Sequence, residues 1–218
     1  MAWYNLFALY YDVAIESLYV QPRVEATEAL DLQPGHTVLD LPVGTGQSLD
    51  GLWAAIQPDG RIVGVDLSTG MLAKARNRVA RKELTGVSLV HRSVHDLDAA
   101  VIAEALDEEQ VDRLHIFLGL SAFPDWEAAF DRMWAVLKPG GRAVIVDVHA
   151  DPVGLQGHLV QLNAGADLKR KTWTRLEALG EGFERRVIST DWRHGGALWL
   201  ATATKPADRS AMATKPAG

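Results

Sequence analysis

The chain has 218 residues, with 22 Lys and Arg against 28 Asp and Glu, so its formal net charge at pH 7 is −6. This length suffices for one domain with a full core. The acidic balance disfavours a nucleic-acid partner, which would need a basic stripe. The absence of cysteine excludes disulfides and thiolate metal sites and fits a cytoplasmic protein. No apolar run is long enough to span a bilayer, so we expect no stable membrane insertion. The oligomeric state stays open.

Two helical patterns occupy the first part of the chain. The first is marked by apolar residues at helical spacing, namely Leu6, Leu9, Tyr10 and Val13. A second helix is expected over residues 22–30, because Pro22 suits a first helical turn. A turn over residues 33–35 follows.

From residue 37 onward, short apolar runs alternate with helical patterns. Strands are expected at 37–41, 61–65, 87–90, 111–118 and 143–148. Helices are expected between them at 47–56, 69–82 and 97–106, and at 126–137 before a turn over 138–141. The alternation predicts a parallel sheet with helices on both faces.

The end of the chain has a different pattern. After a loop and a helix near 172–179, strands are expected at 183–190 and 197–204, with a hairpin turn at 194–196. They bring the sheet to seven strands, mostly parallel, with the last one antiparallel. One domain is expected over 1–205 and a flexible tail over 206–218, where a short polar repeat has little to bury.

The turn after the first strand is a candidate ligand site. The strand ends at Asp40, and Gly44-Thr45-Gly46 follows before a helix. Glycines let the backbone approach a ligand closely, and ligands of open parallel sheets bind beyond the carboxyl ends of the strands. Asp66 ends the next strand, 20 residues after Gly46, where a carboxylate can accept hydrogen bonds from both ribose hydroxyls. Without Asp66, the glycines would indicate only a tight strand-to-helix turn.

The same residues favour one nucleotide over others. A dinucleotide-binding turn needs a third glycine, where this chain has Leu49. Asp40 would repel a pyrophosphate, but it would attract the cationic sulfonium and amino group of S-adenosylmethionine (SAM). A P-loop is excluded because no Gly-Lys-Ser/Thr follows.

Three segments together resemble class I SAM-dependent methyltransferases, over about residues 36–149. Residues 38–46 resemble the family's first motif, usually Asp-x-Gly-x-Gly-x-Gly. Residues 64–68 with Met71 and Leu72 resemble the second, and residues 137–142 resemble the usual turn before the fifth strand. The resemblance implies a Rossmann-like α/β fold, SAM as cofactor and S-adenosylhomocysteine as product.

The resemblance also implies roles for single residues. Asp40 and the glycine turn would hold the methionine end of SAM, and Asp66 would hold the ribose. Ser93 and the backbone of Val94 align with the family's adenine-binding motif, and Leu118 begins the floor beside the methyl group. The implied cofactor contacts are Asp40, Pro42, Gly44, Thr45, Gly46, Asp66, Leu67, Met71, Ser93, Val94 and Leu118.

Two of these positions depart from the family pattern. Pro42 stands where the first glycine of the motif is usual, and proline fixes φ and removes a backbone donor. Ser93 stands where an acidic residue usually reaches the adenine amino group.

Candidate catalytic residues are fewer. His149 follows the fifth strand and would serve as a general base for a hydroxyl acceptor; a loop histidine bonded to backbone or solvent is the alternative. Tyr11 lies on the first helix, and the resemblance implies a helical lid over 1–33; a core-packing helix is the alternative. His194 is expected at the surface and Trp192 in the core or a pocket wall. No histidine spacing indicates a metal site.

The resulting hypothesis is methyl transfer from SAM to an oxygen, nitrogen or carbon nucleophile of a small molecule. The weakly polar residues of the N-terminal helices and of 151–171 favour an aromatic, quinone-like or lipid-like acceptor. Positioning can supply most of the acceleration, so a dedicated base is optional. The alternatives are a SAM- or nucleotide-binding module without transferase activity and an NAD-dependent reductase.

Overall fold

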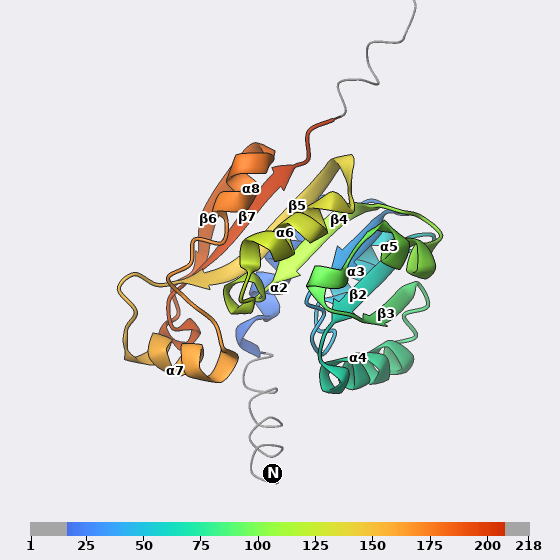
Figure 1. Cartoon of the computed structure of the whole chain (residues 1–218). Coiled ribbons are helices and arrows are strands. Elements are labelled where there is room, and N and C mark those ends of the chain that lie inside the picture. The colour runs from blue at the N-terminus through green and yellow to red at the C-terminus, as the bar shows by residue number, and fades with distance from the viewer. Residues whose placement is uncertain (1–16, 208–218) are drawn as a thin grey trace, which may run out of the picture.

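A computed structural model describes residues 17–207 as a seven-stranded sheet with helices on both faces (Figure 1). The strand order is β3-β2-β1-β4-β5-β7-β6; β1 to β5 are parallel, and β7 runs antiparallel to β5 and β6. This confirms the expected Rossmann-like sheet. The strands are β1 (Thr37–Asp40), β2 (Arg61–Asp66), β3 (Val87–His91), β4 (Val111–Phe117), β5 (Leu137–His149), β6 (Glu181–Ser189) and β7 (Ala197–Thr204).

Two apolar clusters, one on each face, hold the helices to the sheet. One face is covered by α2 (Val20–Ala29), α3 (Leu49–Ile56) and α4 (Thr69–Lys82). The other is covered by α5 (Ala99–Leu106), α6 (Trp126–Ala135) and α8 (Thr174–Leu179). The strand residues alternate between the two clusters, because successive side chains of a strand point to opposite faces. β1 is buried on both faces, as parallel strands between helix layers are.

One additional helix and two shifted boundaries differ from the sequence-based expectation. α7 (Leu155–Ala164) occupies a region expected as a loop. α2 begins at Val20, two residues before Pro22. β5 already begins at Leu137, and the expected turn over 138–141 falls inside it as an irregularity of the β4–β5 register, with Gly140 at a left-handed φ of +76°. The reason is pairing: Leu137 pairs with Val111, and Gly140 N–H donates to Lys205 O at 2.8 Å.

The hairpin between β6 and β7 also corrects two expectations. His194 is buried, not at the surface; its Nε2 lies 2.9 Å from Ser189 Oγ, and burial lowers its pKa. Trp192 is 72% exposed, not in the core. His194 is buried because this turn packs closely on α7, where the backbone of Gly195 leaves no room for a Cβ against Gly157.

Some expectations lie outside the described residues. They are the first helix with Tyr11, the lid before residue 17, and the tail from residue 208 on. In the described part of the chain, no helix is both long and apolar enough to cross a membrane.

Candidate functional site

A cavity of about 140 Å³ lies at the carboxyl ends of the strands. This is smaller than the roughly 300–1,000 Å³ of a complete small-molecule site, so it suits one end of a nucleoside ligand. The cavity is lined by Leu41, Pro42, Asp66, Leu67, Arg92, Ser93, Val94, His95, Phe123 and Pro124. These residues follow β1, β2, β3 and β4, which the parallel register brings to the same edge of the sheet.

Asp66 joins the end of β2 to the glycine turn, which we define as residues 42–46. Its Oδ2 accepts a hydrogen bond from Gly44 N–H at 2.9 Å, and its Oδ1 accepts one from Ser68 N–H at 2.8 Å. A carboxylate has about four lone-pair sites. Each oxygen of Asp66 therefore keeps an acceptor site for a further donor at the cavity.

The glycine turn has a backbone that favours glycine at two positions. Gly44 has φ of +55° and Gly46 has φ of +80°, values that side chains with a Cβ rarely adopt. Val43 N–H donates to Val65 O, and Gly46 N–H donates to Val43 O, both at 2.9 Å. A Cβ placed on Gly44 would meet nothing within 4 Å. The turn therefore leaves open space beside Gly44.

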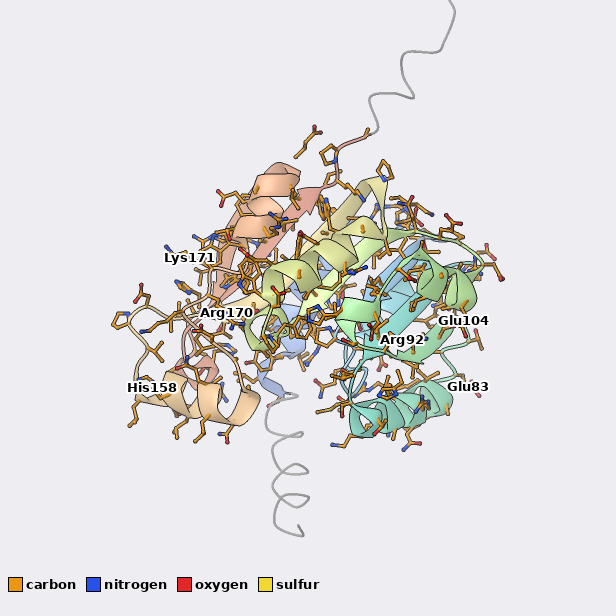
Figure 2. The ribbon with its side chains drawn as sticks, in the orientation of Figure 1. Glu83, Arg92, Glu104, His158, Arg170 and Lys171 are labelled. Atoms are coloured by element: carbon orange, nitrogen blue, oxygen red, sulfur yellow. The ribbon has the colours of Figure 1, made fainter. Side chains whose placement is uncertain are left out.

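The side of the cavity after β3 is formed by residues 92–95. Ser93 Oγ accepts a hydrogen bond from His95 N–H at 3.3 Å, and the side chain of Val94 is buried. Sequence reasoning missed Arg92 and His95, which flank the expected pair and line the cavity with it. Figure 2 shows Arg92 near the end of β3. Sequence reasoning also missed Phe123 and Pro124, which lie beyond the expected end of the fourth strand.

Asp40 is buried at the end of β1. It is 1% exposed, and its Oδ1 accepts a hydrogen bond from Nδ1 of the buried His115 at 2.7 Å. Its other carboxylate oxygen, Oδ2, has no hydrogen-bond partner among the described residues. A buried acceptor without a partner calls for an explanation, because native proteins satisfy nearly all such groups.

Pro42 packs against the loop after β4. A Cβ on Gly119 would lie 2.3 Å from Cδ of Pro42, so the proline ring fills the space that a side chain at residue 119 would need. The preceding residue, Leu118, has a left-handed φ of +56°. Such a conformation in a bulky residue is rare and is found preferentially at functional sites.

Seven of the expected site residues that the structure describes do not line the cavity, namely Asp40, Gly44, Thr45, Gly46, Met71, Leu118 and His149. Met71 lies in the first turn of α4, and Leu118 donates its N–H to Val146 O. His149 ends β5, where its Nδ1 lies 2.9 Å from Leu168 O and its ring meets Trp173 edge-on. His149 is thus held by the segment before α8, and its catalytic role stays a prediction.

A buried carboxylate ties that segment to the loop after β4. Asp147 accepts hydrogen bonds from Ser121 N–H and Ser121 Oγ, both at 2.8 Å, and from Val148 N–H at 2.9 Å. Thr172 Oγ lies 3.4 Å away. Arg170 also donates to the carbonyls of Ser121 and Phe123. Since Phe123 lines the cavity, these contacts hold one of its walls.

The burial of Asp147 predicts a pH dependence of stability. Burial raises its pKa above the ordinary 3.8, although its hydrogen bonds oppose the shift. Between these two pKa values the folded chain holds more protons than the unfolded chain, so this contribution to stability is lost as pH rises through the folded-state pKa. We expect the free energy of unfolding of the wild type, relative to Asp147→Asn, to fall as pH rises from about 4. Urea unfolding over a pH series tests this; a constant difference would contradict it.

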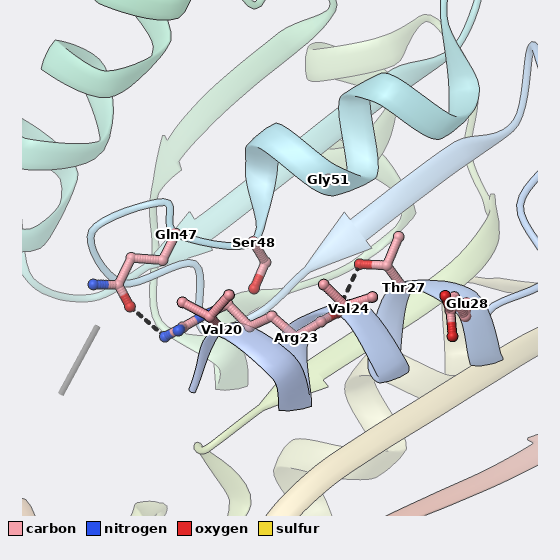
Figure 3. A pocket seen from close by; sticks show the side chains of 8 residues that line it. All are labelled: Val20, Arg23, Val24, Thr27, Glu28, Gln47, Ser48 and Gly51. Carbon is pink, nitrogen blue, oxygen red and sulfur yellow. Dashed lines mark hydrogen bonds between the residues drawn. The ribbon is translucent and has the colours of Figure 1, made fainter. Parts of the chain in front are cut away.

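A second pocket, of about 280 Å³, lies between α2 and the start of α3 (Figure 3). Its walls include the aliphatic side chains of Val20 and Val24, and Arg23 donates a hydrogen bond to Gln47 Oε1. Ser48, which precedes α3, does not cap it with its side chain. Because Gln47 directly follows Gly46, this pocket lies beside the glycine turn.

The fold and the spacing of the motifs are similar to those of class I SAM-dependent methyltransferases, and the comparisons agree. Residues 38–141 match a family model described as "Methyltransferase domain". This match supports placing residues 38–141 among class I SAM-dependent methyltransferase domains.

One curated relative is the demethylmenaquinone methyltransferase of Shouchella clausii, which is 33% identical over 125 residues. The match covers 57% of this chain and 50% of that protein, so the chain spans about half the length of this relative.

Two solved structures show the same fold at low identity. A SAM-dependent O-methyltransferase from Thermotoga maritima has a TM-score of 0.62 at 20% identity, covering 88% of this chain and 67% of that one. The [4+2]-cyclase SpnF has a TM-score of 0.64 at 16% identity, and the match covers 86% of this chain and 82% of that one.

Proposed function

We propose that the protein binds SAM at the carboxyl edge of its sheet and transfers the methyl group to a small-molecule acceptor. The observation that carries this proposal is the lining of the cavity at the strand ends. It contains Pro42, Asp66, Leu67, Ser93 and Val94, all of which the sequence predicted as cofactor contacts.

The residues present fit the two ends of SAM. The free acceptor sites of Asp66 suit the ribose hydroxyls, while Ser93 and the backbone of Val94 suit the adenine edge. The open space at Gly44 and the unpartnered Oδ2 of Asp40 suit the methionine end, which carries a cationic amino group. When bound, SAM supplies a methyl group on a sulfonium. The chain's own task is then to position and shield the two reactants.

We propose an aromatic, quinone-like or lipid-like acceptor. The similarity to a demethylmenaquinone methyltransferase over half the chain supports this class. α7 supports it too, since Leu155, Leu159 and Leu162 are 82%, 49% and 81% exposed on it. Figure 1 places α7 at the edge toward which the parallel strands point. The aliphatic wall of the pocket at α2 adds further apolar surface near the glycine turn.

A binding module without transferase activity is the second candidate. Ser93 in place of an acidic residue favours it, and the likeness to a cyclase illustrates that a fold alone does not determine a reaction.

Calorimetry and a transfer assay separate the candidates. Titration with SAM, S-adenosylhomocysteine and NADH is expected to show binding of the first two only. Labelled methyl transfer from SAM to demethylated quinones or to a lipid extract is then expected. Binding without transfer to any extract fraction would favour the module, and binding of NADH alone would favour a reductase.

A further inference from the structure

Asp40 and His115 form a buried pair below the glycine turn. They are direct register partners on the neighbouring strands β1 and β4. Asp40 is 1% and His115 is 0% exposed, and 2.7 Å separates Oδ1 from Nδ1. The backbone strengthens this link, because Leu41 N–H donates to His115 O at 3.1 Å. His115 therefore holds both the side chain that ends β1 and the chain that enters the turn.

The surroundings of the pair leave two buried polar atoms without a hydrogen-bond partner among the described residues. The ring of His115 stacks on Phe117, with 5.9 Å between centroids and 20° between planes. Among the described residues, neither Asp40 Oδ2 nor His115 Nε2 has a hydrogen-bond partner. A buried carboxylate oxygen without a donor is costly. A ligand that brings an N–H donor to Asp40 would remove this cost.

We propose that His115 is a positioning residue for the amino-acid end of SAM. By occupying Oδ1, it fixes the rotation of the Asp40 carboxylate and reserves Oδ2 for the α-ammonium group. This inference rests on the proposed function, since it concerns the same cofactor. His115 lies outside the sequence motifs. Its proposed role concerns recognition of the amino-acid end of SAM and not of the nucleoside.

The test compares two ligands that differ only at that end. S-adenosylhomocysteine carries the amino-acid group, whereas 5′-methylthioadenosine has the same nucleoside thioether without it. His115→Phe keeps a ring for Phe117 but removes both nitrogens; His115→Asn keeps a side-chain N–H near the position of Nδ1. Calorimetry gives both dissociation constants for the wild type and each variant, and melting curves show that each variant folds.

We expect His115→Phe to raise the dissociation constant of S-adenosylhomocysteine about tenfold, as the loss of a well-oriented charge-assisted bond does. The dissociation constant of 5′-methylthioadenosine should change by less than about twofold. His115→Asn should recover most of the loss. Asp40→Asn should show the same selective loss, which provides a test if His115→Phe fails to fold.

Equal weakening of both ligands by His115→Phe would assign His115 a purely structural role and overturn the inference. So would unchanged binding of S-adenosylhomocysteine. Wild-type protein that binds both ligands equally would overturn the inference but leave the nucleoside site intact. Wild-type protein that binds neither would overturn the proposed function and the inference with it.

Discussion

Replacing Asp66 with alanine is expected to lower the affinity for SAM at least about tenfold. A hydrogen bond to a charged group contributes about 1.5–3 kcal/mol, and about 1.4 kcal/mol corresponds to a factor of ten. The carboxylate also accepts the N–H of Gly44 at 2.9 Å. The substitution therefore removes the proposed ribose acceptor and one contact that shapes the glycine turn.

Graded variants separate these two effects. Asp66→Asn keeps one oxygen of similar position, so it should retain part of the affinity. Asp59→Ala removes an exposed carboxylate from the turn between α3 and β2 and serves as the matched control with no loss. Calorimetry with S-adenosylhomocysteine gives the affinities, and melting curves check the fold. Affinity unchanged in Asp66→Ala would refute the ribose assignment.

Local patterns explain why most of the sheet and several residues that line the cavity could be predicted. Short apolar runs between helical patterns predict buried parallel strands, and Asp66 lies at a motif spacing that needs no tertiary information. The cavity indeed contains Pro42, Ser93 and Val94 as well. Each of these residues comes two or three positions after the end of a strand, so its place is set largely by the register of that strand.

Contacts between segments that are distant in the sequence could not be predicted from local patterns. Asp40 and His115 are 75 positions apart and meet only because β4 lies beside β1, a strand order that no local pattern contains. α7 was expected as a loop for a related reason. Its buried contact is a glycine, Gly157, and its leucines are exposed, so its pattern is the reverse of an ordinary amphipathic helix.

Pro42 and Gly119 illustrate how such a distant contact compensates for a local departure. Proline at residue 42 breaks the family's glycine pattern, and nothing near it in sequence accommodates its ring. The accommodation comes from the loop after β4, where residue 119 has no side chain and the ring occupies that space. The ring of Pro42 therefore fits sterically only because residue 119 is glycine.

Gly119→Ala is accordingly expected to destabilise the fold and weaken cofactor binding together. The added Cβ would lie 2.3 Å from Cδ and 2.7 Å from Cγ of Pro42, and a proline ring cannot rotate away. Gly119 has a φ of −139°, so alanine meets no left-handed strain and the effect is steric. Overpacking of this kind costs about 1–3 kcal/mol, or about 2–4 °C in Tm per kcal/mol for a chain of this size.

The double variant makes this prediction specific. Pro42→Gly removes the ring and restores the glycine of the family motif, so Pro42→Gly with Gly119→Ala should regain most of the stability and cofactor affinity lost in Gly119→Ala alone. Residues in contact couple in this way, whereas independent sites add. Gly140→Ala is a poor control because its φ is +76°; Gly154→Ala, where a Cβ meets nothing within 4 Å, is a better one. Additive losses in the double variant would show that the two positions act separately and that the loop after β4 does not support the glycine turn through Pro42.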